Sequence, residues 1–404
     1  MNADYPSPLG ASIWPSLRRL ASNVARLCRS SGGTREAPAE GNDRHLWHWV
    51  RHRPEEHAVG GSAVSANDER VDDRRLVTRL IAAYRAAAET DTGSTDSYWL
   101  GHFAALKRPI HDLLLGDDAD AVARVLRAPK RSTLLLGMDD LTSEMEPGED
   151  RMWRPAWLRQ HQTIYDNMWR LAEAIGVRRL EHPEHYPLRA ASPPDVEILL
   201  SELDAAFGFR IDFPNPFAGE IGLATTRGVA SYRAIQSLYQ AWRIRRVAAD
   251  QPACRILEIG AGLGRTAYYV RRFGIKNYTI VDLPITNVAQ TYFLGCLLGD
   301  ECLQLYGESA HAEAIRILPP SSFFDSEERF DLVVNVDSLT EMAPETARRY
   351  WNEITKRTPL FLSINHEANY FTVRDLYAAY PSSHVCRSPY WMRRGYVEEL
   401  IRFE

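Results

Sequence analysis

The feature that most constrains this chain is the run from Arg255 to Asp282, RILEIGAGLGRTAYYVRRFGIKNYTIVD. An apolar strand is followed by a glycine-rich turn, an amphipathic helix and a second apolar strand that ends on a carboxylate. Gly260, Gly262 and Gly264 permit a tight turn and a close backbone approach to a ligand, because glycine has no Cβ. The helix after the turn directs its amino-terminal N–H groups toward that ligand. The run therefore predicts a βαβ unit that binds a nucleoside.

The spacing of the turn indicates which nucleoside it is. A dinucleotide site has the pattern G-x-G-x-x-G and holds a pyrophosphate. Here the pattern is G-x-G-x-G, with Arg265 in place of the third glycine, and Glu258 precedes the first glycine by two positions. A carboxylate at that point repels a pyrophosphate but suits an ammonium and a sulfonium group, so we expect S-adenosylmethionine. The alternative is a βαβ turn with a structural role only.

The second strand supports a ribose site. Asp282 follows Gly264 by 18 residues, close to the spacing of about 20 at which an acid accepts hydrogen bonds from ribose hydroxyls. Leu318 and Pro319, after the third strand, are apolar groups that suit an adenine. The expected cofactor-binding residues are Glu258, Gly260, Ala261, Gly262, Gly264, Asp282, Leu283, Asn335, Asp337 and Ser338.

Composition excludes several classes of function. The net charge of −5 over 404 residues gives no electrostatic reason to expect a nucleic-acid partner. The five cysteines are scattered without a CxxC pair, so neither a disulfide framework nor a zinc site is indicated, and we expect no metal. No apolar run approaches the ~20 residues needed to cross a bilayer. We therefore expect a cytoplasmic protein without membrane contacts.

The pattern along the chain suggests three parts. Residues 1–70 are rich in Gly, Ser, Ala and charge, typical of a flexible arm that docks on its own domain or on a partner subunit, so a homodimer is one expectation. Residues 71–208 have apolar residues at three- and four-residue intervals and read as a mainly helical domain. Strands and helices alternate over residues 209–404, which predicts a doubly wound, Rossmann-like α/β sheet.

Candidate catalytic residues follow the fourth and fifth strands of this sheet, whose carboxyl ends should face the cofactor. Methyl transfer is an in-line displacement, and a hydroxyl acceptor requires a general base within hydrogen-bond reach. We rank His366 first, because imidazole titrates nearest neutral pH, then Glu341, then Asp337. Each has a structural alternative: His366 as a hydrogen-bonding residue, Glu341 as a solvated helix charge and Asp337 as a helix cap or cofactor ligand.

Substrate-binding candidates come from two regions. Arg227 lies in a TTRG turn and Tyr232 near the start of the next helix, where Arg233 and Gln240 are further pocket candidates. Tyr232 has core packing as its alternative role. The loop after the fifth strand adds the last two candidates, Asn365 and Glu367.

Five segments together resemble the family of sugar O-methyltransferases found in bacterial natural-product and surface-polysaccharide pathways. They are FPNPFAGEIGLATTRGVASYRAIQSLYQAWRI, ILEIGAGLGRTAYY, YTIVDLPITNVAQTYFL, NVDSLTEM and LSINHEAN. The similarity covers about half of the chain, from roughly Phe209 to the carboxyl terminus. The resemblance implies a methyltransferase sheet and transfer to a hydroxyl of a small-molecule sugar or glycoside. Family members often have glutamine where this chain has His366, so the resemblance does not itself imply a histidine base. A nitrogen or phenol methyltransferase, and a non-catalytic protein that retains the fold, are the alternatives.

Overall fold

The computed structural model describes residues 62–64, 73–90, 104–129, 132–135, 137–138, 163–180, 195–217, 219–248, 253–380 and 383–404. The expected flexible arm, residues 1–70, lies outside these ranges except for a short strand. Residues 52–404 form one compact unit. This unit contains described residues from both ranges that we expected as domains, 71–208 and 209–404.

The centre of this unit is an eight-stranded sheet with the order β10-β11-β9-β8-β4-β5-β7-β6. Neighbouring strands from β9 to β6 pair in parallel, while β11 runs antiparallel to both β9 and β10. This confirms the doubly wound α/β class. The strands are β4 (Ile256–Ile259), β5 (Tyr278–Val281), β6 (Leu303–Leu305), β7 (Ile315–Leu318), β8 (Leu332–Val336), β9 (Leu360–His366), β10 (Ser383–Pro389) and β11 (Tyr396–Phe403).

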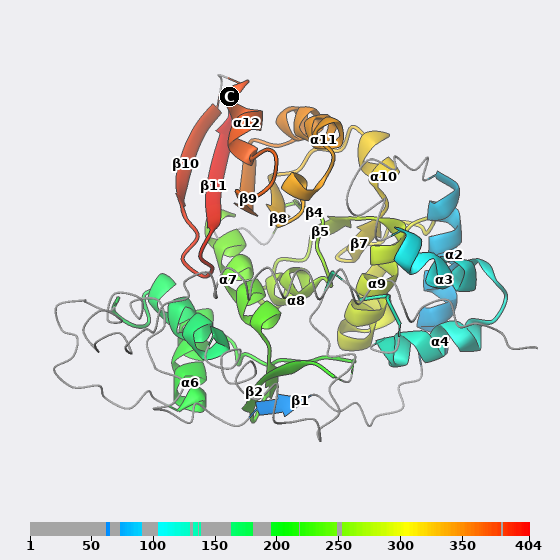
Figure 1. Cartoon of the computed structure of the whole chain (residues 1–404), viewed down its shortest axis with the longest axis horizontal. Helices are drawn as coiled ribbons and strands as arrows, with labels where there is room; N and C mark the ends of the chain where they lie inside the picture. The colour runs from blue at the N-terminus through cyan, green and yellow to red at the C-terminus, as the bar shows by residue number, and fades with distance from the viewer. Residues whose placement is uncertain are drawn as a thin grey trace, which may run out of the picture. The chain divides into compact units, whose positions relative to one another are not determined.

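Helices cover both faces of the sheet, because its central strands are apolar on both sides. Successive residues of β4 join different cores: Ile256 packs with one buried cluster and Leu257 with the other. In Figure 1, α7–α9 lie on one side of the strands and α10–α12 on the other. These helices are α7 (Tyr232–Val247), α8 (Arg265–Arg272), α9 (Pro284–Leu298), α10 (Pro320–Phe324), α11 (Pro344–Arg357) and α12 (Val373–Ala378).

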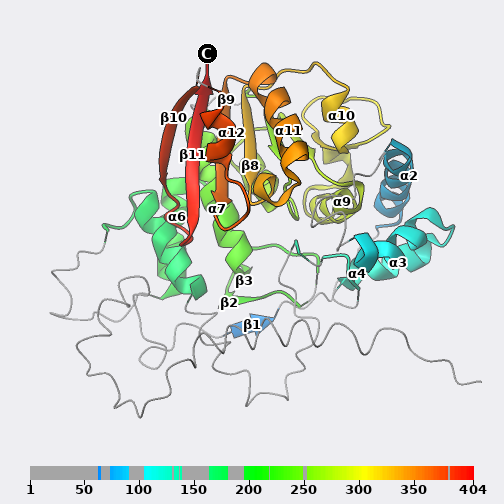
Figure 2. The same cartoon turned by 45° about the horizontal axis from the view of Figure 1, so that its top comes forward.

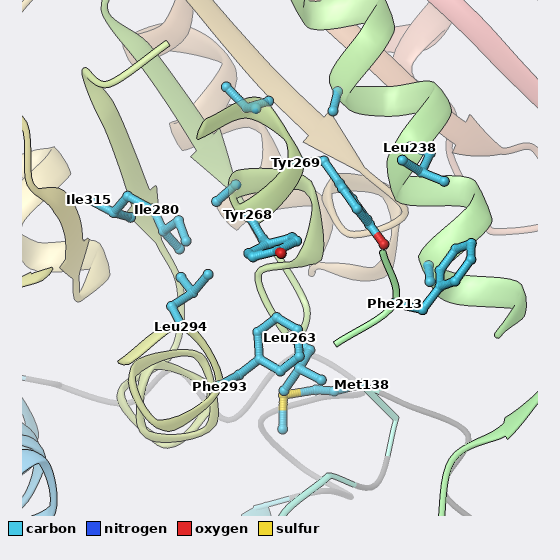
Figure 3. Packing of buried hydrophobic residues seen from close by; sticks show 14 of the residues in the cluster. Met138, Phe213, Leu238, Leu263, Tyr268, Tyr269, Ile280, Phe293, Leu294 and Ile315 are labelled. Carbon is cyan, nitrogen blue, oxygen red and sulfur yellow. The ribbon is translucent and has the colours of Figure 1, made fainter. Parts of the chain in front are cut away.

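The larger core joins α7, α8 and α9 beneath the glycine turn. Figure 3 shows Tyr268 and Tyr269 of α8 between Leu238 of α7 and Phe293 of α9. All four side chains are buried, and the hydroxyl of Tyr269 donates to the carbonyl of Asp212 at 2.9 Å. This packing fixes the position of α8, and hence of the turn that precedes it.

The amino-terminal helices pack directly on the sheet domain. They are α2 (Arg74–Thr90), α3 (Ala104–Leu115), α4 (Ala119–Arg127) and α6 (Val196–Phe207), and residues 163–174 are also helical. Buried Asp73 accepts hydrogen bonds from the Tyr292 hydroxyl of α9 at 2.7 Å and from Arg127 Nε of α4 at 2.9 Å. Figure 2 shows α2–α4 beside α9. None of the described helices is long and apolar enough to cross a bilayer.

A second, three-stranded sheet was not expected from the sequence. It consists of β1 (Ser62–Val64), β2 (Ile221–Thr225) and β3 (Gly228–Ala230), all antiparallel. A Cβ on Gly222 would lie 2.3 Å from the carbonyl oxygen of Ala230, so glycine allows β2 and β3 to approach. Because β1 pairs with β2, part of the range expected as an arm belongs to the folded unit. The turn-rich appearance of residues 209–230 concealed the two later strands.

Candidate functional site

A cavity of about 560 Å³ lies at the carboxyl ends of the parallel strands. The strand order reverses between β4 and β8, and in open α/β sheets this reversal is where ligands bind. Its size falls within the range of about 300–1,000 Å³ typical of small-molecule sites. Its walls include the segments 258–263 after β4, 281–283 after β5, 319–321 after β7 and 336–338 after β8.

The three glycines of the turn have different roles. All three adopt left-handed backbone conformations, with φ angles of 74° at Gly260, 56° at Gly262 and 87° at Gly264. A Cβ on Gly260 would lie 2.1 Å from the side-chain oxygen of Ser338, so this glycine is required by packing. A Cβ on Gly262 would meet nothing within 4 Å. Gly262 lines the cavity, so the space beside it is open to a ligand.

Two buried carboxylates line the cavity beside the turn. Glu258 accepts a hydrogen bond from the Tyr278 hydroxyl at 2.9 Å, and burial raises its pKa to about 7. Asp282 accepts from the backbone N–H of Leu283 and from Gln290 Nε2, both at 2.8 Å, and burial raises its pKa to about 6. Gln290 also donates to the carbonyl of Gly262 at 2.9 Å, which links the second strand to the turn.

Lys107 interacts electrostatically with Asp282, and the sequence did not lead us to expect it. It belongs to α3, only 4% of it is exposed, and its charge interacts with that of Asp282. Burial lowers the pKa of Lys107 to about 8, against the opposing effect of the carboxylate. Its position on the buried face of an amphipathic helix was the available signal. The helical region therefore contributes to the electrostatics of Asp282.

The end of β8 is locked to the end of β4. Asn335 is completely buried, and its Nδ2 donates to the Ile259 carbonyl at 2.8 Å and to the side-chain oxygen of Ser338 at 2.6 Å. Asn335 and Gly264 do not line the cavity. The other residues expected to bind the cofactor do line it: Glu258, Gly260, Ala261, Gly262, Asp282, Leu283, Asp337 and Ser338. Asn335 thus acts by supporting the turn.

Asp337 has an unusual conformation. Its φ of 53° places a non-glycine residue in the left-handed region, a local strain of about 1–3 kcal/mol that often marks functional sites. One carboxylate oxygen, Oδ2, accepts a hydrogen bond from the Tyr396 hydroxyl at 2.7 Å and lies 3.5 Å from Arg393. The other, Oδ1, is buried without a hydrogen bond among the described residues. Asp337 therefore presents an oriented carboxylate to the cavity.

The three candidate bases come together, but not on equal terms. Ligand-capable atoms of Asp337, Glu341 and His366 lie within 4.8 Å of one another. Asp337 and Glu341 line the cavity, whereas His366 does not. His366 Nε2 lies 3.6 Å from Asp337 Oδ1, beyond hydrogen-bond range, and its Nδ1 accepts from the Ala368 N–H at 3.3 Å. Asp337 and Glu341 are therefore the two candidates that can contact a ligand in the cavity without a rearrangement.

Three of the four substrate-binding candidates have structural partners instead of a place in the cavity wall. Arg227 pairs with Asp204 at 2.5 Å and holds the loop before β2. Asn365 Nδ2 donates to Asn335 at 3.0 Å, and Glu367 pairs with Arg387 at 2.9 Å. Residue type and sequence position alone do not show whether a polar side chain faces the cavity. Among the four, Tyr232 lines the cavity.

Further parts of the wall come from α7 and from the hairpin between β10 and β11. Arg233 and Gln240, which we expected, line it together with residues that we missed. Positions 233, 236, 237 and 240 fall on one face of a helix, so helical spacing from the expected pair could have identified the two on α7. No local signal marks the hairpin residues. The missed residues are Gln236, Ser237, Tyr390, Arg393 and Tyr396.

Comparison with known proteins gives structural likeness only. No protein-family model matches the chain, and no curated protein does. The CcbJ methyltransferase from Streptomyces caelestis is similar to it over 42% of this chain and 89% of that one, with 13% identity and a TM-score of 0.31. TrmN from Thermus thermophilus is similar over 60% of this chain and 80% of that one, with 15% identity and a TM-score of 0.31. Magnesium protoporphyrin IX methyltransferase from Synechocystis PCC 6803, solved with bound S-adenosylmethionine, covers 42% of this chain and 83% of its own, with 11% identity and a TM-score of 0.29. Such scores are too low to carry an assignment, so the fold is assigned from the strand order.

Proposed function

We propose that this chain is an S-adenosylmethionine-dependent methyltransferase that acts on a sugar hydroxyl. The observation that carries the proposal is the glycine turn at the reversal of strand order, with Glu258 and Asp282 buried beside it. The open space at Gly262 leaves room for a ligand against the backbone. Two desolvated acids in one cavity are costly for a fold that needs only packing, and they suit a ligand with hydroxyl and ammonium groups.

The residues fit the parts of this cofactor. Asp282 is placed to accept hydrogen bonds from ribose hydroxyls, and Glu258 is placed to hold the ammonium group. Pro319 provides an apolar surface for the adenine. When bound, S-adenosylmethionine supplies an electrophilic methyl group. Asn335 and Ser338 keep the turn in place by tying β8 to β4.

Asp337 is the proposed general base. Its carboxylate lines the cavity, and Tyr396 and Arg393 orient it from the second oxygen. Asp337 would take the proton of the acceptor hydroxyl as that oxygen accepts the methyl group that bound S-adenosylmethionine would supply. General base catalysis of this kind contributes about 10²–10⁴-fold. His366 does not line the cavity, and its Nε2 lies 3.6 Å from Asp337 Oδ1.

The sugar acceptor is supported by the chemistry of the other wall. Tyr232, Ser237 and Gln240 add hydroxyl and amide groups to a surface that also contains tyrosine rings, a combination that suits hydroxyl-rich, partly apolar sugar faces. The five segments that resemble sugar O-methyltransferases include both Tyr232 and Asp337. A neutral nitrogen acceptor would not require a base such as Asp337, and a phenol, which is more acidic than a sugar hydroxyl, would depend on one less.

Calorimetric titration with S-adenosylmethionine tests the first part of the proposal. We expect one site per chain for the native protein and loss of binding in the Glu258→Gln variant. Arg246→Gln on the exposed end of α7 is the matched control. Absence of binding to the native protein would contradict the proposed function. A panel of free, nucleotide-linked and natural-product sugars, with product analysis for O-methylation, tests the acceptor.

A further inference from the structure

The face of α7 that lines the cavity has polar side chains, and two of them have partners within the protein. Gln236 accepts a hydrogen bond from the Tyr390 hydroxyl at 2.9 Å and donates to Asn167 at 2.7 Å. Gln240 accepts from the Thr266 hydroxyl at 2.6 Å. Ser231 caps the helix by accepting from the Ala234 N–H at 3.2 Å. The direction of this face is therefore fixed by contacts on both sides.

Arg233 is the exception on this face. Its Nε is buried without a hydrogen bond, and within the described part of the chain no ion pair forms on its guanidinium group. A buried donor without an acceptor costs about 1–3 kcal/mol, and more for a charged group. Arg233 also lines the cavity. A ligand anion beside the guanidinium group would offset part of the cost of burying its charge.

The other arginines of the cavity wall are engaged. Arg265 pairs with buried Glu220 at 2.7 Å. Arg393 lies 3.5 Å from the Asp337 carboxylate. The guanidinium carbon of Arg349 lies 3.7 Å from the centre of the Phe324 ring. Arg233 and Arg349 are therefore the described cavity-lining arginines without an ion pair, and of the two Arg349 is exposed to solvent whereas Arg233 is partly buried.

The acids of the cavity indicate which anion is involved. Glu258, Asp282 and Asp337 line the same space, so a ligand carboxylate that enters it needs a cation close by. A guanidinium group matches a carboxylate with two parallel hydrogen bonds. The proposed cofactor always brings one carboxylate, whereas an acceptor sugar need not be charged.

We infer that Arg233 binds the carboxylate of the methyl donor, while Glu258 holds the ammonium group of the same amino acid end. The inference rests on the proposed function, because it assumes that S-adenosylmethionine occupies the cavity. It assigns the two charges of the amino acid end to different elements, β4 and α7. Cofactor binding would therefore connect α7, which also forms the acceptor wall through Tyr232, to the sheet.

The test compares S-adenosylmethionine with its decarboxylated form, S-adenosylmethylthiopropylamine, by calorimetric titration. In the Arg233→Gln variant we expect the affinity for S-adenosylmethionine to fall about 10–100-fold, as for loss of hydrogen bonds to a charged group. Affinity for the decarboxylated form should stay within twofold of the native value. Arg233→Lys should recover part of the lost affinity for S-adenosylmethionine. Arg246→Gln, on the same helix, should leave the affinity for both ligands unchanged.

Equal losses of affinity for both ligands would overturn the inference, because Arg233 would then affect binding without contacting the carboxylate. Unchanged affinity for S-adenosylmethionine in Arg233→Gln would also overturn it. If in that case uridine diphosphate binds the native protein but not the variant, the anion belongs to the acceptor. A native protein that binds neither adenosyl ligand would contradict the proposed function itself, an outcome separate from any difference between variants.

Discussion

The two ends of the cavity are built in different ways. The proposed cofactor end comes from one continuous segment: Glu258 lies in β4, Gly262 in the turn after it, and Asp282 directly after β5. The acceptor end gathers Tyr232, Asp337 and Tyr396 from α7, the loop after β8 and the start of β11. One end is a local motif with fixed spacing, and the other depends on the tertiary fold.

The difference also concerns what holds each end in place. Backbone geometry sets the cofactor end, through left-handed glycines and the link from Gln290 to the turn. Side chains hold one another at the acceptor end, where Tyr396 and Arg393 both contact Asp337. Substitutions at the first end should therefore abolish cofactor binding, while substitutions at the second should change the chemistry and leave cofactor binding intact.

The largest effect is expected from Gly262→Val. The new side chain would point into open space that the ligand needs, so binding of S-adenosylmethionine should fall below detection by calorimetry. Gly274→Val is the matched control: its φ of 86° is also left-handed, and no atom lies within 4 Å of the new Cβ, but it does not line the cavity. Both variants carry a similar backbone strain of about 1–2 kcal/mol. Equal loss of binding in both would mean that strain, and not the ligand space, is responsible.

The acceptor end is tested by Asp337→Asn, which keeps the shape of the side chain and removes the base. With an acceptor found by the sugar panel, kcat should fall about 10²–10⁴-fold, and the dissociation constant for S-adenosylmethionine should stay within threefold. His366→Gln should lower kcat less than tenfold, because His366 does not line the cavity. A greater loss in His366→Gln than in Asp337→Asn would restore the order suggested by the sequence alone.

The same comparison explains what the sequence could predict. The strands β4, β5, β7, β8, β9 and β11 were predicted because apolar runs and turn residues are local signals. Most of the residues that we expected to bind the cofactor do line the cavity, because the glycine turn and the strand ends that carry them are local signals too. The edge strands β6 and β10 were missed, since β6 has only three residues and the seven residues of β10 are mostly exposed, so neither has a clear apolar pattern.

The acceptor wall could not be predicted from local signals. Arg393 and Tyr396 reach the cavity because β11 runs antiparallel beside β9, which brings Tyr396 opposite His366. Arg227 and Glu367 were expected in the site because they are polar and close to it in sequence, yet ion pairs retain them elsewhere. Lys107 comes from a helix far earlier in the chain. Only the tertiary fold decides such contacts.

A smaller effect is expected from Asp282→Asn, which sharpens the role of the ribose-side acid. The amide can still accept one hydrogen bond but has no charge, so affinity for S-adenosylmethionine should fall by about 1.5–3 kcal/mol, the range for hydrogen bonds to charged groups. Loss of Asp282 also leaves the buried Lys107 without its nearby acid, which should lower the melting temperature of the free protein. A change in affinity below about 0.5 kcal/mol would show that Asp282 is not a ribose ligand.

The smallest effect is a pH dependence at the cofactor end. Burial raises the pKa of Glu258 to about 7, and the ammonium group of the ligand favours the charged carboxylate. Affinity for S-adenosylmethionine should therefore fall about tenfold from pH 8 to pH 6, as protonation of Glu258 competes with binding. Asp282, with a pKa of about 6, adds a smaller loss at the lower end.

Stability of the free protein should change in the opposite direction over the same range. The folded protein retains a proton on Glu258 between its unfolded value of 4.5 and about 7, so the folded state binds more protons there than the unfolded state. The contribution of this group is complete below pH 4.5 and is lost as pH rises through 7. Thermal melting with and without S-adenosylmethionine, from pH 5 to pH 8, measures both trends.

In Glu258→Gln this part of the pH dependence should disappear, because glutamine does not titrate. A free protein whose pH profile is unchanged by that substitution would show that Glu258 is charged throughout, and the acid would then have to be held by a cation that the cavity wall provides.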